Sequence, residues 1–210
     1  MSRTYYTSRT VVRMLFSLLT RCEVKGRENI PEQGPLLVVA NHLSLADPPL
    51  LGVTLGRQLR FMAKKQLFRF GPMAYFMRSL GVFPVYRGQL DRQAMRQAYQ
   101  ILAQGQALVM FPEGMRSRSR QLRPAFSGVA LIACRSGAAV LPVGISGSEK
   151  TERPFQLLCR PQITVNIGRP FYLPSPRSKL TKHELSELTN TIMQHIAELL
   201  PQEYRGHYAP

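Results

Sequence analysis

A histidine and an aspartate stand five positions apart behind an apolar run, in the segment LLVVANHLSLADPPL (36–50). Five residues of an ideal helix turn about 500°, so His42 and Asp47 would lie roughly 140° apart around a continuous helix. A turn must therefore bring the two side chains together. Pro48 and Pro49 favour a helix that starts here, with Asp47 as its N-cap.

The pair has the residue types of a general base. Because Pro48 and Pro49 have no N–H, Asp47 has fewer backbone donors to satisfy and its carboxylate can accept from the imidazole. Such a contact fixes the tautomer and leaves the other ring nitrogen of His42 free to take a proton from a hydroxyl. The ordinary alternative is a capping aspartate beside an inert histidine. The histidines on the expected surface helix and C-terminal segment are interpreted as inert: His183, His195 and His207.

A second polar cluster, FPEGMRSRSR (111–120), follows another apolar run. Gly114 permits a tight turn, Glu113 can hydrogen-bond a polyol hydroxyl, and Arg116 or Arg118 can hold a phosphate through two hydrogen bonds. A third run, GVFPVY (81–86), leads into Arg87. Since sites gather at strand ends in α/β sheets, the sequence predicts an anion site there, although RSRSR is also typical of flexible or RNA-binding tracts.

Short apolar runs alternate with segments of helical period, which predicts a single α/β domain. The expected strands are 36–40, 59–63, 81–86, 107–111, 139–145 and 163–167. The expected helices are 89–104, closed by Gly105, 127–136, and one that starts at Thr181, where Glu184 completes a capping box. Residues 23–200 are predicted to form the domain and 201–210 a tail of low complexity.

Residues 4–22 have an apolar helical face opposite a basic one, within a predicted N-terminal segment 1–22. This pattern predicts a helix that lies in a membrane interface or one that packs on the domain. No run of about 18 apolar residues is present, so a membrane-spanning helix is not expected. No small-residue cleavage site follows the apolar stretch, so no signal peptide is expected.

The chain has 210 residues and a formal charge of +16, which requires an anionic partner such as nucleic acid, an acidic membrane surface or phosphorylated substrates. Its 44% hydrophobic content predicts a folded core. Cys22, Cys134 and Cys159 are widely spaced and lack a metal-ligand pattern, so they are interpreted as buried free thiols in a reducing compartment.

Four segments in order, NHLSLAD, GVFPVYRG, FPEGMRSRS and VLPVGI, make the chain similar to the lysophosphatidate acyltransferase family (1-acyl-sn-glycerol-3-phosphate acyltransferases). They span residues 41–145, and RFMAKKQLF (60–68) also matches. The resemblance implies a mixed, mostly central β-sheet flanked by helices, as in glycerophosphate acyltransferases. The family more often has threonine at Met115, glutamate at Gln66 and a lysine before Gly128, which puts the acceptor in doubt more than the reaction.

The resemblance also implies residue roles. His42 would be the catalytic base and Asp47 its partner, Glu113 and Gly114 would contact the glycerol or organise the site, and the acceptor's phosphate would bind Arg87, Arg116 and Lys64. The implied reaction moves an acyl group from acyl-CoA or acyl carrier protein to a lysophospholipid, giving phosphatidic acid, at the cytoplasmic face of an anionic membrane. No metal, cofactor or nucleic acid is expected. Other acceptors, such as a lyso-amino lipid, a basic nucleic-acid-binding role, and a nucleophilic enzyme using Ser44 or a cysteine stay open as alternatives.

Overall fold

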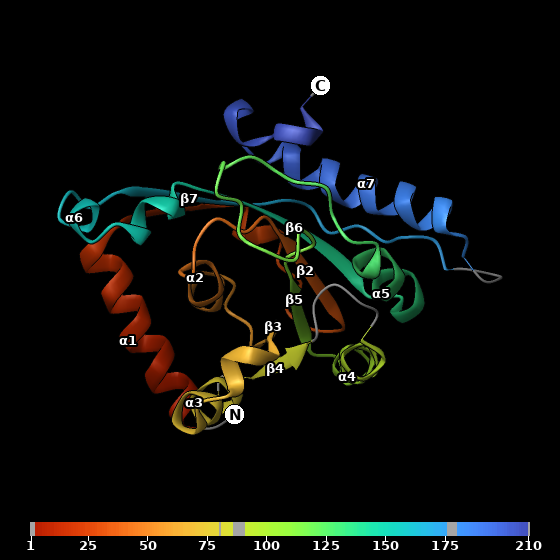
Figure 1. The fold of residues 1–210 in the computed structure, drawn as a ribbon, viewed down its shortest axis with the longest axis horizontal. Helices are drawn as coiled ribbons and strands as arrows, with labels where there is room; N and C mark the ends of the chain where they lie inside the picture. Colours follow the sequence, from red (N-terminus) through yellow and green to blue (C-terminus); the bar gives the residue numbers. More distant parts are fainter. Residues whose placement is uncertain (1–2, 80, 86–90, 176–179, 210) are drawn as a thin grey trace.

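A computed structural model describes residues 3–79, 81–85, 91–175 and 180–209 (Figure 1). Its described strands form a seven-stranded sheet in the order β1-β7-β6-β2-β5-β3-β4. Strand β7 runs antiparallel to β6, and the other neighbours pair in parallel. The predicted mixed sheet is therefore confirmed. The strands are β1 (Arg21–Lys25), β2 (Leu36–Ala40), β3 (Leu59–Lys64), β4 (Val82–Val85), β5 (Ala107–Met110), β6 (Ala139–Ser146) and β7 (Gln162–Ile167).

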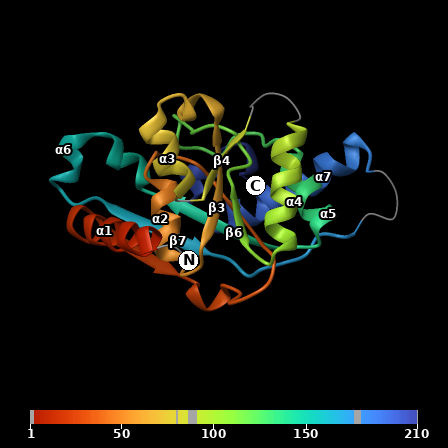
Figure 2. The same cartoon turned by 90° about the horizontal axis from the view of Figure 1, so that it is seen from below.

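Helices cover both faces of this sheet (Figure 2). On one face lie α4 (Arg92–Ala103), α5 (Gly128–Ser136) and α7 (Lys182–Glu198); on the other lie α1 (Arg3–Leu19) and α2 (Asp47–Thr54). The central strand β2 is buried throughout, because Leu37 and Val39 pack on the first group and Leu36 and Val38 on α2. Short helices α3 (Gly71–Ser79) and α6 (Pro154–Leu157) complete the edges.

Two helix boundaries follow from local capping. Thr181 and Glu184 form the predicted capping box, and α7 begins directly after it. The helix expected from residue 89 begins at Arg92 instead, because the Asp91 carboxylate accepts from Gln93 N and Ala94 N and caps it there.

The N-terminal helix is shorter than predicted. It ends at Leu19, and residues 21–25 form β1, which pairs in parallel with β7. The expectation of a helix through Cys22 was wrong because an edge strand with mostly exposed side chains leaves only a weak alternating pattern in the sequence. The expectation of buried thiols holds for Cys134 alone of the three, since Cys22 and Cys159 are exposed.

The segment 201–210 is not a loose tail in its described part. It forms two 3₁₀ turns, Gln202–Tyr204 and Gly206–Tyr208, and Tyr204 is buried. The Tyr204 hydroxyl donates to Glu149 Oε1 over 3.0 Å, and Leu122 N donates to Tyr204 O over 2.8 Å. The segment thereby covers the loop that follows β5.

The topology brings the chemistry-bearing segments to one edge of the sheet. Strands β2, β3, β5 and β6 all run parallel, so their carboxyl ends share that edge. His42 follows β2, Glu113 follows β5, and a 3₁₀ turn (Ser148–Glu152) follows β6. This edge is where open α/β sheets place their sites.

Candidate active site

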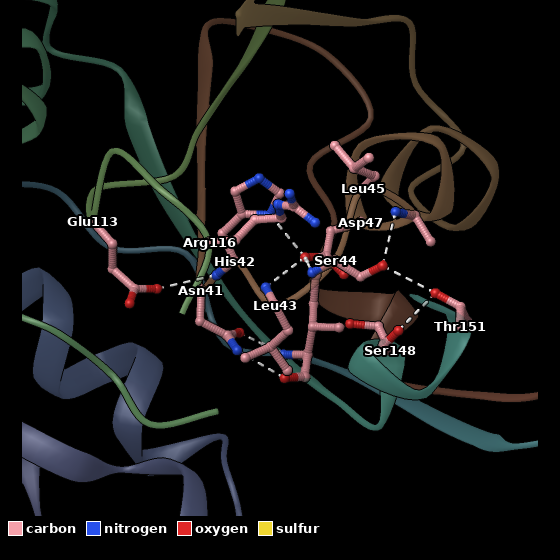
Figure 3. Close-up of polar contacts among 12 residues, drawn as sticks. Asn41, His42, Leu43, Ser44, Leu45, Asp47, Glu113, Arg116, Ser148 and Thr151 are labelled. Atoms are coloured by element: carbon pink, nitrogen blue, oxygen red, sulfur yellow. Dashed lines mark hydrogen bonds and ion pairs between the residues drawn. The ribbon is translucent and has the colours of Figure 1, made fainter. Parts of the chain in front are cut away.

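The His42–Asp47 contact is present in the structure (Figure 3). His42 Nδ1 lies 2.8 Å from Asp47 Oδ2, which also accepts from Leu43 N over 2.7 Å and from Ser44 N over 2.8 Å. The Asp47 carboxylate can only accept, so Nδ1 carries the proton and Nε2 is the acceptor nitrogen. The turn between His42 and Asp47 therefore fixes the tautomer that a general base needs.

Asp47 is not the N-cap of α2, contrary to the sequence interpretation. It is the first residue of the helix, after Ala46, and no side chain caps this end. The reason is that the N–H groups of Leu43 and Ser44 and the imidazole draw its carboxylate back over the loop. Asp47 is fully buried, and its Oδ1 accepts no hydrogen bond from the described part of the chain.

Contacts with two other segments hold His42 in place: Phe111 contacts its ring, and Ile145 binds the side chain of the preceding residue, Asn41. The His42 ring stacks on Phe111, with ring centroids 4.2 Å apart and planes at 21°. Asn41 exchanges hydrogen bonds with the backbone of Ile145 in β6, donating through Nδ2 over 2.8 Å and accepting at Oδ1 over 2.7 Å. The Asn41 side chain thus continues the β2–β6 ladder and sets where His42 leaves the sheet. Neither contact was expected from the sequence, because each joins residues that lie far apart along the chain; Ile145, for example, is 104 positions from Asn41.

Glu113 supports the backbone of the site. Its Oε1 accepts from His42 N and its Oε2 from Arg123 N, each over 3.1 Å. The side chain is buried, and this burial raises the pKa of Glu113 to about 7, against the lowering effect of the two backbone hydrogen bonds. Of the two roles that the resemblance implied, this geometry supports that of organising the site.

Gly114 makes the tight turn that directs the rest of this loop. Its φ is +69°, and a Cβ there would lie 2.7 Å from Cε2 of Phe126. A side chain at this position would therefore be strained and would clash. Ser117, in the RSRSR tract for which flexibility was the alternative interpretation, is buried and donates its N–H to His42 O over 2.7 Å, so this part of the tract is anchored beside the histidine.

Of the three cations predicted to bind phosphate, the structure places Arg116 and Lys64 at the same edge of the sheet. Arg116 is half-exposed, and its guanidinium forms an ion pair with Glu152, whose Oε1 also accepts from Leu45 N over 3.4 Å. Lys64 ends β3 at the same edge of the sheet, two strands from β2. Arg87 lies outside the described residues. Sequence reasoning missed Glu152, because its role depends on a loop 36 positions from Arg116.

Two pockets adjoin the loop from His42 to Asp47. One, of about 540 Å³, is mostly apolar and lies between α1 and this loop, lined among others by Leu15, Phe16 and Leu45. The other, of about 870 Å³, is strongly basic and is lined by Leu43, Met115, Arg116, Ser117, Arg118, Ser119, Arg120, Arg123, Glu149, Glu152 and Arg153. Arg116 and Glu152 border both pockets, so their ion pair lies at the junction between an apolar and a cationic compartment.

Ser44 is poorly suited to nucleophilic attack. Its side chain is buried, its Oγ accepts from Ala46 N, and it lies 2.9 Å from Thr151 Oγ1. Because the Thr151 hydroxyl donates to Ser148 O, the Ser44 hydroxyl must donate to Thr151. The described residues contain no group of three or more His, Cys, Asp or Glu side chains that could hold a metal ion. They also contain no helix that is both long and apolar enough to cross a bilayer.

Glu113 makes stability depend on pH. A folded pKa of about 7 lies above the ordinary 4.5, so the native state holds a proton that the unfolded state has lost between these values. The free energy of unfolding contributed by this group should therefore fall as pH rises from about 4.5 to 7 and stay constant above that. Denaturant unfolding at pH 5 and pH 8 should show this fall in the wild type and a smaller one in Glu113→Gln. Equal pH dependence of the two proteins would contradict the assignment.

Comparison with known proteins identifies the family of this chain. The family described as "Acyltransferase" matches residues 21–146. A 1-acyl-sn-glycerol-3-phosphate acyltransferase of Bacillus subtilis is 25% identical over 90% of this chain and 92% of its own length. A chloroplastic 1-acyl-sn-glycerol-3-phosphate acyltransferase of Brassica napus is 30% identical over 62% of this chain but only 38% of its own length.

Two further relatives bear on the fold and the acceptor. The crystal structure of the 1-acyl-sn-glycerophosphate acyltransferase PlsC from Thermotoga maritima has a TM-score of 0.72 and 25% identity, with 93% of this chain and 78% of the other covered. A lyso-ornithine lipid O-acyltransferase of Pseudomonas aeruginosa is 32% identical over 63% of this chain and 52% of its own length.

Proposed function

Because this chain belongs to the acyltransferase family, we propose that it transfers a fatty acyl group from a thioester to the free hydroxyl of 1-acyl-sn-glycerol-3-phosphate, giving phosphatidic acid. The donor is acyl-CoA or acyl carrier protein. The observation that carries the proposal is the His42–Asp47 contact, which leaves Nε2 as an acceptor, while the next residue, Leu43, lines a pocket rich in arginines. Relatives named as 1-acyl-sn-glycerol-3-phosphate acyltransferases support the choice of acceptor.

The proposed reaction needs one base and two binding regions. His42 Nε2 takes the proton of the acceptor hydroxyl as its oxygen attacks the thioester carbonyl carbon. The C–S bond then breaks, and the imidazolium returns the proton to the leaving thiolate. Asp47 stabilises the imidazolium between these steps, and the apolar pocket beside α1 offers space for an acyl chain.

One assay tests this function directly. The purified protein is incubated with a panel of lyso-lipids and both thioester donors, and the products are identified by mass spectrometry. Formation of phosphatidic acid from 1-acyl-sn-glycerol-3-phosphate is expected. Absence of transfer from either donor, together with tight RNA binding, would favour the nucleic-acid alternative instead.

We propose that Arg116 binds the acceptor's phosphate, together with Arg87 and Lys64. Glu152 competes with the phosphate for Arg116. Replacing a charge-assisted hydrogen bond costs about 1.5–3 kcal/mol, so Arg116→Ala should raise the KM for lysophosphatidate by roughly 10- to 100-fold. Glu152→Gln should lower that KM, since Arg116 loses its present partner. Arg96→Ala, on α4, serves as a control of equal charge change. Unchanged KM in Arg116→Ala would remove this residue from the acceptor site.

A lyso-amino lipid is the second candidate acceptor. The basic pocket also contains Glu149 and Glu152, which can bind an ammonium group that a phosphate acceptor lacks. The lyso-ornithine lipid O-acyltransferase among the relatives supports the same class. Glu152→Gln separates the two candidates, because it should weaken transfer to a lyso-amino lipid while strengthening transfer to lysophosphatidate.

We propose that α1 is the main membrane contact and that the enzyme works as a peripheral protein on the cytoplasmic face of an anionic membrane. Met14 and Leu18 are 66% and 69% exposed, and residues 1–22 contain no acidic side chain. Met14→Ser combined with Leu18→Ser should weaken binding to anionic vesicles by roughly tenfold or more, measured by cosedimentation at low and high salt. Vesicle binding equal to that of the wild type would exclude α1.

A further inference from the structure

A second exposed apolar segment lies beside the end of α1, at α6 and the residues that flank it (153–160). Phe155 is 64% exposed and Leu158 is 86% exposed. Arg153 and Arg160 stand on either side of them, and the segment RPFQLLCR contains no acidic residue. Two exposed apolar side chains between two arginines in one short segment form a candidate binding surface, whereas a single exposed apolar side chain would need no explanation.

This segment is fixed to α1 by direct contacts. Arg160 Nη2 donates to Ser17 O over 2.8 Å, so the basic end of the segment is attached to the helix. Leu157 lines the apolar pocket together with Leu15 of α1. Figure 1 shows α6 next to the carboxyl end of α1, which agrees with the lining of one pocket by residues of both helices.

The active-site loop adds to the same surface. Leu45, between His42 and Asp47, is 69% exposed and lines the pocket with Leu15 and Leu157. Apolar side chains from three separate segments, the exposed Leu15 and Leu45 and the partly buried Leu157, thus line one pocket together with Ser44 and Arg116. Because these side chains come from α1, α6 and the loop after β2, the packing of a single helix does not explain why they lie together.

We propose that residues 153–160 form a second membrane contact, in which Phe155 and Leu158 enter the interface of an anionic bilayer while Arg153 and Arg160 bind lipid phosphates. With α1 and Leu45, this contact would turn the mouth of the apolar pocket toward the lipid. An acyl chain can then enter without crossing water. Only the identity of the molecule that enters the pocket rests on the proposed function; the membrane contact itself does not.

Charge favours a bilayer over a protein as the occupant. Arginines flank the apolar residues of both α1 and α6, and the whole chain carries +16. Arginine side chains can lie along apolar groups while their guanidinium groups stay among phosphates, which suits the headgroup region. A helix of four residues such as α6 offers too little surface for a stable protein interface by itself.

The exposed thiol of Cys159 allows a direct measurement. In a Cys22→Ser protein, Cys159 is the remaining exposed cysteine, since Cys134 is buried. An environment-sensitive fluorophore such as NBD on Cys159 should show a blue shift and stronger emission with vesicles of phosphatidylglycerol and phosphatidylcholine. A lipid-borne doxyl quencher should reduce that emission. An unchanged NBD spectrum in protein that cosediments with the vesicles would overturn the proposal.

A matched label elsewhere controls for non-specific effects. Tyr172 is 72% exposed and follows Phe171, which pairs with Val140 at the amino end of β6, away from the site edge. The same fluorophore on Tyr172→Cys, in a Cys22→Ser/Cys159→Ser protein, should not respond to vesicles. An equal response at both positions would also overturn the proposal, because it would show adsorption without orientation.

Substitutions test the contribution to binding. Phe155→Ser combined with Leu158→Ser should weaken vesicle binding by roughly tenfold or more, whereas Tyr172→Ser should not. Transfer to acceptor in vesicles should fall with binding, while transfer to acceptor dispersed in detergent should be kept, which also shows that the variant is folded. Wild-type vesicle binding in this variant would contradict the proposal. If no acyl transfer occurs in either form but the Cys159 response is present, the proposed function fails and the membrane contact stands.

Discussion

Replacing His42 by alanine should reduce acyl transfer by about 10²- to 10⁴-fold or to below detection, because a positioned general base contributes an acceleration of that size. The loss should appear in kcat, since the proposed phosphate and acyl-chain contacts do not involve the imidazole. Initial rates with lysophosphatidate and a thioester donor measure it. Vesicle binding and the cooperative unfolding transition should be kept, although the lost stacking on Phe111 should lower stability somewhat.

Two further variants make this prediction specific. His42→Gln can still donate to Asp47 but cannot accept and return a proton at neutral pH, so it should be as inactive as His42→Ala. His183→Ala removes an exposed histidine of α7 and should leave transfer unchanged. If His42→Ala turns over near the wild-type rate, another group is the base and the proposed mechanism is wrong.

Asp47→Asn should lower kcat by roughly 10²-fold or more, because it replaces the carboxylate that stabilises the imidazolium by a neutral amide. The amide oxygen of asparagine can still accept from Leu43 N, Ser44 N and the imidazole, so the loop should keep its shape. The KM for the acceptor should therefore change little. Steady-state kinetics of the variant measure both constants.

Asp47→Ala provides the contrast. It leaves the buried N–H groups of Leu43 and Ser44 without their acceptor, at about 1–3 kcal/mol for each unsatisfied group, and should therefore also lower the free energy of unfolding. Denaturant unfolding of both variants separates the two effects. If Asp47→Asn retains full kcat, the carboxylate serves only to shape the loop.

The proposed mechanism assigns binding and proton transfer to different parts of the chain. His42 and Asp47 lie in one turn after β2, whereas the arginines that line the basic pocket come from the loops after β5 and β6. Glu113 connects these parts, since it binds the N–H of His42 at one oxygen and that of Arg123 at the other. A change in the arginine loop can therefore be transmitted to the position of the base.

Much of the fold could be predicted from local patterns. Apolar runs of strand length gave the strands β2 to β7 within one or two residues, and the capping box at Thr181 gave the start of α7. The contact between His42 and Asp47 was also predictable, because both residues lie in one short turn bounded by prolines. These features depend on residues within a few positions of each other, where periodicity and capping act.

The tertiary structure decided the features that join distant segments. Asn41 meets Ile145 and Arg116 meets Glu152 only because β6 lies beside β2 in the sheet and β5 lies on its other side. The same order gives Glu113 its buried position, which no local pattern shows. The edge strand β1 and the exposed α6 were also missed, because a side chain's exposure depends on what packs against it. The sequence by itself therefore indicated the contact between His42 and Asp47, and the strand order determined which distant residues, such as Glu152 and Ile145, join the same region.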